Sequence, residues 1–194
     1  MTTPFDQKAP GLVRRLMADF GLTDIQAAAI VGNLGHESGL VAINEKNPTV
    51  PGSRGGYGWA QWTGPRRVAF ERYVARTHQD PTSDGAQYGY LWRELSGHEP
   101  GFDYRHAIEK LKETTTLEAA TDTFQAHYEK AGIKHTASRR AWAQKALSAF
   151  RGQPAANAEV KRIQERLTAL GHPVVADGVI GPQTLGAIAA ALGV

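Results

Sequence analysis

The chain of 194 residues contains no cysteine. This absence excludes disulfide bonds, thiolate zinc sites and catalysis by a cysteine nucleophile. No apolar run approaches the ~20 residues that a membrane span requires, and the first residues lack the charged and then apolar layout of a secretory signal. No cofactor motif is present, and no set of His and Glu has a metal-ligand spacing. We therefore expect a globular protein without cofactor, metal or stable membrane insertion, in which any catalyst is a carboxylate, hydroxyl or imidazole.

The charge is low and positive, with a formal net charge of +3 and a pI near 9.2. The excess of basic residues falls within residues 1–156. A basic protein favours a polyanionic target, which here includes cell wall, lipopolysaccharide and nucleic acid. An excess this small does not discriminate among these targets.

One carboxylate in the first third of the chain has a distinctive predicted position. Thr23 and Gln26 have the spacing of a capping box, so a helix should begin near Thr23. Gly39 is suited to the position just past the end of that helix. Glu37 then lies in the last turn, where the negative end of the helix dipole disfavours its charged form.

The residues after this helix suit a sugar-binding cleft. Gln61 lies within a Gly-rich segment that also supplies Tyr57, Trp59 and Trp62. Aromatic faces and amides are the groups that bind sugars, and partial burial among these rings would raise the pKa of Glu37. A Glu that is neutral at working pH is a general acid.

The rest of residues 1–152 is predicted to be mainly helical. Gly32 and Gly35 each cost about 1 kcal/mol within a helix relative to Ala, so another backbone should pass close to them. Periodicity and capping signals predict further helices over residues 11–20, 65–77, 84–96, 115–128 and 138–150. A short hairpin within residues 41–64 is the only β structure expected.

Two motifs carry a family resemblance. Gly-Asn-Leu-x-x-Glu-Ser-Gly-Leu occupies residues 32–40, and Gly-Tyr-Gly-x-Ala-Gln-Trp-x-x-x-Arg occupies residues 56–66. Over about residues 9–151 the chain resembles the phage tail-type lysozyme family, which is similar to goose-type lysozymes and soluble lytic transglycosylases. The resemblance implies a lysozyme-like helical domain that acts on peptidoglycan.

The resemblance also implies roles for particular residues. Glu37 is the expected general acid, and Glu45 is the first choice for a second carboxylate because the connection that carries it should fold back over the cleft. Asp84 and Glu129 remain alternatives, and a scheme with one carboxylate would position water by polar groups such as Gln61. The expected substrate-binding residues are Ser38, Tyr57, Trp59, Gln61, Trp62, Tyr128 and Glu129.

The end of the chain predicts a second module. Residues 1–152 form the expected catalytic domain, and the small, aperiodic residues 153–158 form a linker. Residues 159–194 resemble the peptidoglycan-binding modules attached to many wall hydrolases, and form a short helical module. Fewer than about 40 residues seldom fold alone, so we expect this module to dock on the first domain.

Together the two resemblances predict a muramidase that cuts the β-1,4 bond between N-acetylmuramic acid and N-acetylglucosamine. We expect a monomeric phage endolysin with peptidoglycan and no nucleic acid as partner, made in the host cytoplasm without a signal peptide and released to the wall through a holin. The alternatives are a lytic transglycosylase, which forms 1,6-anhydro products, and a non-catalytic wall-binding or tail structural protein. A chitinase would fit a similar cleft, but the terminal module argues against it.

Overall fold

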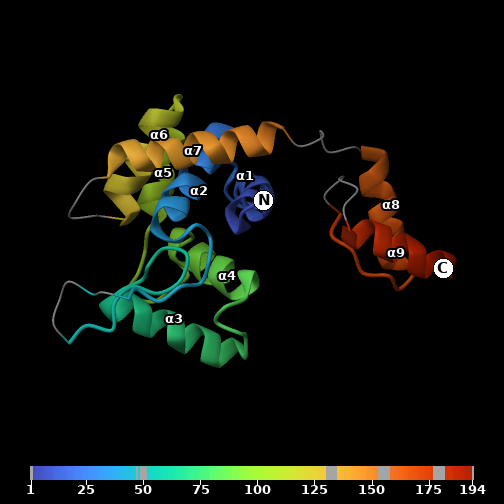
Figure 1. Cartoon of the computed structure of the whole chain (residues 1–194), viewed down its shortest axis with the longest axis horizontal. Coiled ribbons are helices and arrows are strands. Elements are labelled where there is room, and N and C mark those ends of the chain that lie inside the picture. Colours follow the sequence, from blue (N-terminus) through green and yellow to red (C-terminus); the bar gives the residue numbers. More distant parts are fainter. Residues whose placement is uncertain are drawn as a thin grey trace. The chain divides into compact units, whose positions relative to one another are not determined.

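The computed structural model describes residues 2–46, 48, 52–129, 135–152, 158–176 and 182–193. The chain forms two compact units, Met1–Phe150 and Arg151–Val194 (Figure 1). The predicted linker lies outside the described residues except for Ala158, which begins a helix.

The described residues are mainly helical, as predicted, and no strand forms among them. The first unit contains α1 (Pro4–Phe20), α2 (Asp24–Ser38), α3 (Gly64–Thr77), α4 (Asp84–Leu95), α5 (Arg105–Lys112), α6 (Leu117–Phe124), the π-helix η1 (Gln125–Glu129) and α7 (Thr136–Arg151). The second unit contains α8 (Ala158–Ala169) and α9 (Pro182–Leu192). No helix among the described residues is long and apolar enough to span a membrane.

The first helix begins earlier than its periodicity predicts. Thr3 and Asp6 form a capping box, in which each side chain accepts the backbone N–H of the other residue. This box starts α1 before Pro10, and Pro10 lies inside the helix and not at its start. Local capping therefore overrides the proline as the signal for the helix boundary.

Other expectations need correction. The helix α6 begins at Leu117, later than the predicted residue 115, and is capped by Thr116, whose hydroxyl accepts the N–H of Ala119. The helix α5 was not expected. The predicted hairpin is reduced to isolated antiparallel bridges, in which Tyr57 pairs with Asn44 and with Trp62.

The second helix lies at the centre of the first unit. It packs against α1 and α6, and every residue from Gln26 to Gly35 is buried. Its first residues, Asp24 and Ile25, and its last residues, from His36 to Ser38, are partly exposed. The scaffold therefore brings one end of a buried helix, with Glu37, to the surface.

The second unit is a pair of helices. The Gln164 side chain donates a buried hydrogen bond of 2.9 Å to the Thr184 hydroxyl, which joins α8 to α9. Leu167 is also buried, whereas Leu170, Leu185 and Leu192 are exposed. Few apolar side chains are thus buried within this unit.

Candidate active site

The helix that carries Glu37 has the boundaries that the sequence predicts. The Thr23 hydroxyl accepts the N–H of Gln26, and the Gln26 side chain accepts the N–H of Thr23. Gly39 adopts the left-handed conformation at φ 63° and donates its N–H to the Gly35 carbonyl at 2.8 Å. Glu37 therefore lies in the last turn of α2, with 20% of its side chain exposed.

The two helix glycines of α2 lie at close contacts with other elements. A Cβ on Gly32 would come within 2.4 Å of the Ala143 backbone, so α7 and α2 touch at their main chains. A Cβ on Gly35 would come within 2.5 Å of the Phe5 ring. The predicted close approach of a second backbone is confirmed at Gly32, and it brings the start of α7 to the end of α2.

This approach places a buried arginine beside Glu37. Arg139 is 2% exposed, and its Nη2 donates to Glu37 Oε1. Its Nη1 donates to Asn33 Oδ1 at 3.0 Å, while the Asn33 amide donates to the carbonyls of Ala29 and Thr121. The sequence predicted that aromatic rings surround Glu37, but the group that bonds to its carboxyl is the guanidinium of Arg139.

A second carboxyl group lies at the end of the π-helix. One oxygen of Glu129, Oε1, is fully buried and has no hydrogen-bond partner. Burial and, next, the negative charge of Glu37 raise the pKa of Glu129 to about 8, although Arg66 and Arg139 act in the opposite direction. A carboxyl whose pKa is raised by burial and by the charge of a second carboxyl is typical of acid and base pairs in active sites. π-helices themselves are frequent at functional sites.

A buried network lies next to this pair. Glu94 is 0% exposed and accepts hydrogen bonds from Arg66, at 2.8 and 2.9 Å, from Trp62 Nε1 at 2.8 Å and from the Tyr128 hydroxyl at 2.6 Å. Arg66 also lies over the Tyr104 and Tyr128 rings. The network fixes Tyr128, the residue before Glu129, inside the core.

Burial corrects three of the expected substrate contacts. Trp59 is 3% exposed, Trp62 is 1% exposed and Tyr128 is 0% exposed. Rings this deeply buried offer no face on which a sugar can stack. They belong to the hydrophobic core that supports the site.

Ser38 and Gln61 bond to the backbone around the site. The Ser38 hydroxyl donates to the Trp59 carbonyl at 2.9 Å, which ties the end of α2 to the turn between Tyr57 and Trp62. The Gln61 amide donates to the carbonyls of Gly58 and Ile43. Tyr57 is partly buried. Substrate contact by these three residues remains a prediction.

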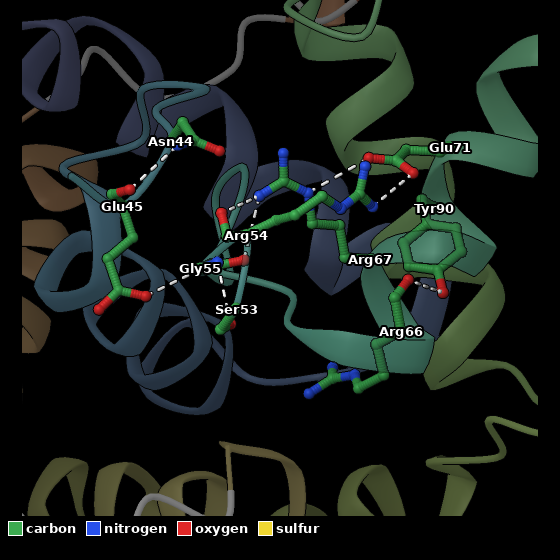
Figure 2. Close-up of polar contacts among 10 residues, drawn as sticks. Asn44, Glu45, Ser53, Arg54, Gly55, Arg66, Arg67, Glu71 and Tyr90 are labelled. Atoms are coloured by element: carbon green, nitrogen blue, oxygen red, sulfur yellow. Dashed lines mark hydrogen bonds and ion pairs between the residues drawn. The ribbon is translucent and has the colours of Figure 1, made fainter. Parts of the chain in front are cut away.

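Glu45 anchors a turn. Its Oε2 accepts the Gly56 N–H at 2.9 Å, and its own N–H donates to the Gly56 carbonyl at 2.8 Å. Beside it, Arg67 donates to the carbonyls of Arg54 and Gly55 (Figure 2). Among the described residues, no hydrogen bond or ion pair joins the Glu45 side chain to Glu37 or its partners. The structure thus brings Glu129, and not Glu45, into the network of Glu37.

The remaining alternative, Asp84, is also engaged elsewhere. Its side chain pairs with Lys8 at 2.5 Å and is 53% exposed. In the part of the chain that the structure describes, no group of three or more His, Asp or Glu residues is arranged to hold a metal ion.

The helical scaffold and the paired carboxyls fit the lysozyme-like class that the motifs predict. A family model described as phage tail lysozyme matches residues 8–150, and the chain belongs to this family. Comparisons with curated proteins and with solved structures gave no match. Membership in the family defines a lysozyme-like, peptidoglycan-lytic function. The match ends before the second unit, so the resemblance of residues 159–194 to wall-binding modules remains a prediction.

Proposed function

We propose that the protein is a muramidase that hydrolyses the β-1,4 bond between N-acetylmuramic acid and N-acetylglucosamine, with Glu37 as the general acid. The observation that carries the proposal is the pair of Glu37 and Glu129, two carboxyls in unlike environments beside Arg139. Hydrolysis of a glycosidic bond requires one carboxyl to protonate the leaving oxygen and a second to act as nucleophile or as base for water.

The electrostatics of the pair support a single shared proton. The raised pKa of Glu129 keeps one proton on the pair up to about pH 8. The charge of Arg139 acts on both carboxyls, because it bonds to Glu37 and also lowers the pKa of Glu129. One guanidinium thus stabilises whichever member is ionised. In the proposed cycle the proton moves to Glu37 when the sugar binds, and the charge moves to Glu129.

Glu129 replaces Glu45 as the proposed second carboxyl. Among the described residues, no hydrogen bond or ion pair joins the Glu45 side chain to Glu37 or Arg139, and Glu45 Oε2 instead accepts the Gly56 N–H. Glu129 Oε1 has no protein partner. The position of Glu129 beside the Glu94 network also gives it a rigid support.

The biological setting follows from the family and remains part of the proposal. A phage enzyme of this kind would act as an endolysin, made in the host cytoplasm and released to the wall through a holin. The second unit would bind peptidoglycan or stabilise the first unit. We expect a monomer with antimicrobial activity toward cells whose wall is accessible.

Digestion of purified peptidoglycan tests the proposal. We expect loss of turbidity and, by mass spectrometry, fragments that end in reducing N-acetylmuramic acid. Fragments that are lighter by one water and carry 1,6-anhydro ends would identify a lytic transglycosylase. Reducing N-acetylglucosamine would identify a different glycosidase, and unchanged turbidity would leave a non-catalytic wall-binding protein.

A further inference from the structure

A surface groove with a volume of about 480 Å³ lies along one face of α3. The helix lines it with residues at the spacing of a single helical face, namely Pro65, Val68, Ala69, Arg72 and Arg76. The other lining residues, Glu99, Pro100 and Phe102, come from the segment between α4 and α5. Neither Glu37 nor Glu129 lines the groove, so it is separate from the carboxyl pair.

The segment opposite α3 is a fixed turn. The Phe102 N–H donates to the Glu99 carbonyl at 3.0 Å, and Gly101 has φ 83°. Proline and then glycine at the two central positions, with a positive φ at the glycine, are the features of a type II turn. Arg93 Nε also pairs with the Glu99 carboxylate at 2.8 Å. This side of the groove is therefore formed before any ligand binds.

The two arginines of the groove carry positive charges that the protein does not neutralise. Both are exposed, and among the described residues neither forms a hydrogen bond or an ion pair. The acidic residues of α3 and of residues 94–103 all have arginine partners of their own: Glu71 pairs with Arg54 and Arg67, Glu94 with Arg66, Glu99 with Arg93, and Asp103 with Arg105. Arg72 and Arg76 are thus the excess charges of this surface.

Helix stability does not explain both arginines. Arg76 lies in the last turn of α3, where a cation interacts favourably with the end of the helix dipole. Arg72 lies four positions earlier, and like charges at this spacing on a helix repel each other. A ligand with anionic groups would turn this repulsion into attraction.

The groove matches a short acidic peptide. Pro65 and Val68 are exposed at the beginning of α3 and offer an apolar surface to small side chains such as that of alanine. At the other half of the helix, each guanidinium can bind a carboxylate through two N–H donors. The stem peptide of peptidoglycan has both features, because it combines alanine with residues that carry free carboxylates.

We propose that this groove binds the stem peptide of peptidoglycan, with Arg72 and Arg76 on its carboxylates and Val68 against an alanine side chain. This inference rests on the proposed function, because it names a part of the same substrate that binds outside the carboxyl pair. A contact with the peptide is the same before and during cleavage of the sugar bond. Such a contact lowers KM and leaves kcat unchanged.

The double substitution Arg72→Gln and Arg76→Gln tests the inference on soluble, uncrosslinked peptidoglycan strands. We expect KM to rise about tenfold, the effect of losing two exposed ion pairs, with kcat unchanged. On strands whose stem carboxylates have been converted to amides, the variant and the wild-type enzyme should have the same KM.

The matched control is Arg14→Gln with Lys112→Gln. It removes the same net charge from α1 and α5, at residues that line no part of the groove and form no ion pair among the described residues. This control should keep the KM of the wild-type enzyme on strands with free carboxylates.

An unchanged KM in the variant without Arg72 and Arg76 would overturn the inference and leave the muramidase proposal intact. An equal rise in KM in the control would also overturn it, because net charge alone would then attract the substrate. A variant that keeps its KM but no longer binds vesicles of phosphatidylglycerol would assign the groove to an anionic lipid instead. A wild-type enzyme that cleaves neither kind of strand would refute the proposed function, and this inference with it.

Discussion

Two neighbouring clusters of glutamate and arginine differ in how completely they are paired. Glu94 receives four hydrogen bonds, two of them from Arg66, and no atom of the Glu94 carboxylate is left without a partner. In the other cluster, Arg139 joins Glu37 while atoms of Arg139 and Glu129 remain unpaired. A cluster whose bonds all lie within the protein supports the fold. A cluster that keeps unpaired polar atoms can bind a ligand and carry out chemistry.

The largest effect should come from Glu37→Gln, which removes one proton donor and almost no volume. We expect activity on purified peptidoglycan to fall by about 10²–10⁴-fold, the usual contribution of a general acid. Wall binding and the far-UV circular dichroism spectrum should stay unchanged. A variant that keeps more than about 1% of the wild-type rate would remove Glu37 from the mechanism.

A substitution in the cluster of Glu94 and Arg66 should lower the free energy of unfolding. Glu94→Gln leaves the buried Arg66 charge without its counterion, which costs about 3–5 kcal/mol. For a chain of this size we expect Tm to fall by about 10 °C. The matched control is Glu71→Gln, which breaks pairs of an exposed glutamate with Arg54 and Arg67 and should cost at most about 1 kcal/mol. An equal decrease in Tm in the two variants would show that the Glu94 cluster does not support the fold more than an exposed ion pair does.

The unpaired cluster should make both activity and stability depend on pH. Because the pKa of Glu129 is raised to about 8, the folded protein keeps a proton that the unfolded chain releases near its ordinary pKa. The contribution of Glu129 to the free energy of unfolding is therefore greatest at low pH. It decreases as the pH rises toward 8, by at most about 1.4 kcal/mol per pH unit. The variant Glu129→Gln should lack this slope in pH-dependent thermal unfolding.

Glu129 should also determine how the rate depends on pH. The pair loses its proton above about pH 8, so kcat/KM of the wild-type enzyme should fall on the alkaline side of that pH. Azide should restore cleavage to Glu129→Ala, because a small anion can replace the activated water, but not to Glu37→Ala. Rescue of the Glu37 variant alone would reverse the two roles.

The smallest effect should come from Glu45→Gln, because the amide oxygen of Gln can still accept the Gly56 N–H. We expect the rate on peptidoglycan to stay within about tenfold of wild type, as for the loss of part of one hydrogen bond. A decrease in rate as large as that of Glu37→Gln would indicate that Glu45, and not Glu129, is the second catalytic carboxyl.

Local signals allowed much of the scaffold to be predicted. The capping pair of Thr23 and Gln26, together with Gly39, determines both ends of α2 and hence the place of Glu37. Gly32 marked the close approach of another backbone. These features depend on residues within one helix or on the lack of a side chain, and both are visible in a sequence.

The electrostatic partners could not be predicted in this way. Arg139 lies 102 positions from Glu37, and nothing in the local pattern distinguishes it from the adjacent Arg140, which pairs with the exposed Asp122. The same limit applies to Trp62. Its local sequence suggests a ring on which a sugar stacks, but its indole N–H donates to Glu94, which is 32 positions away in the chain.

The contact between Gly32 and Ala143 has a consequence for engineering the enzyme. Replacing a helix glycine with alanine is a standard route to thermostability, worth up to about 1 kcal/mol where the site is open. Gly11 in α1 is such a site, since a Cβ there meets no atom within 4 Å. At Gly32 the same exchange would push α7 away from α2 and carry Arg139 with it. Two glycines that look interchangeable in an alignment would therefore have opposite value in a stabilisation library.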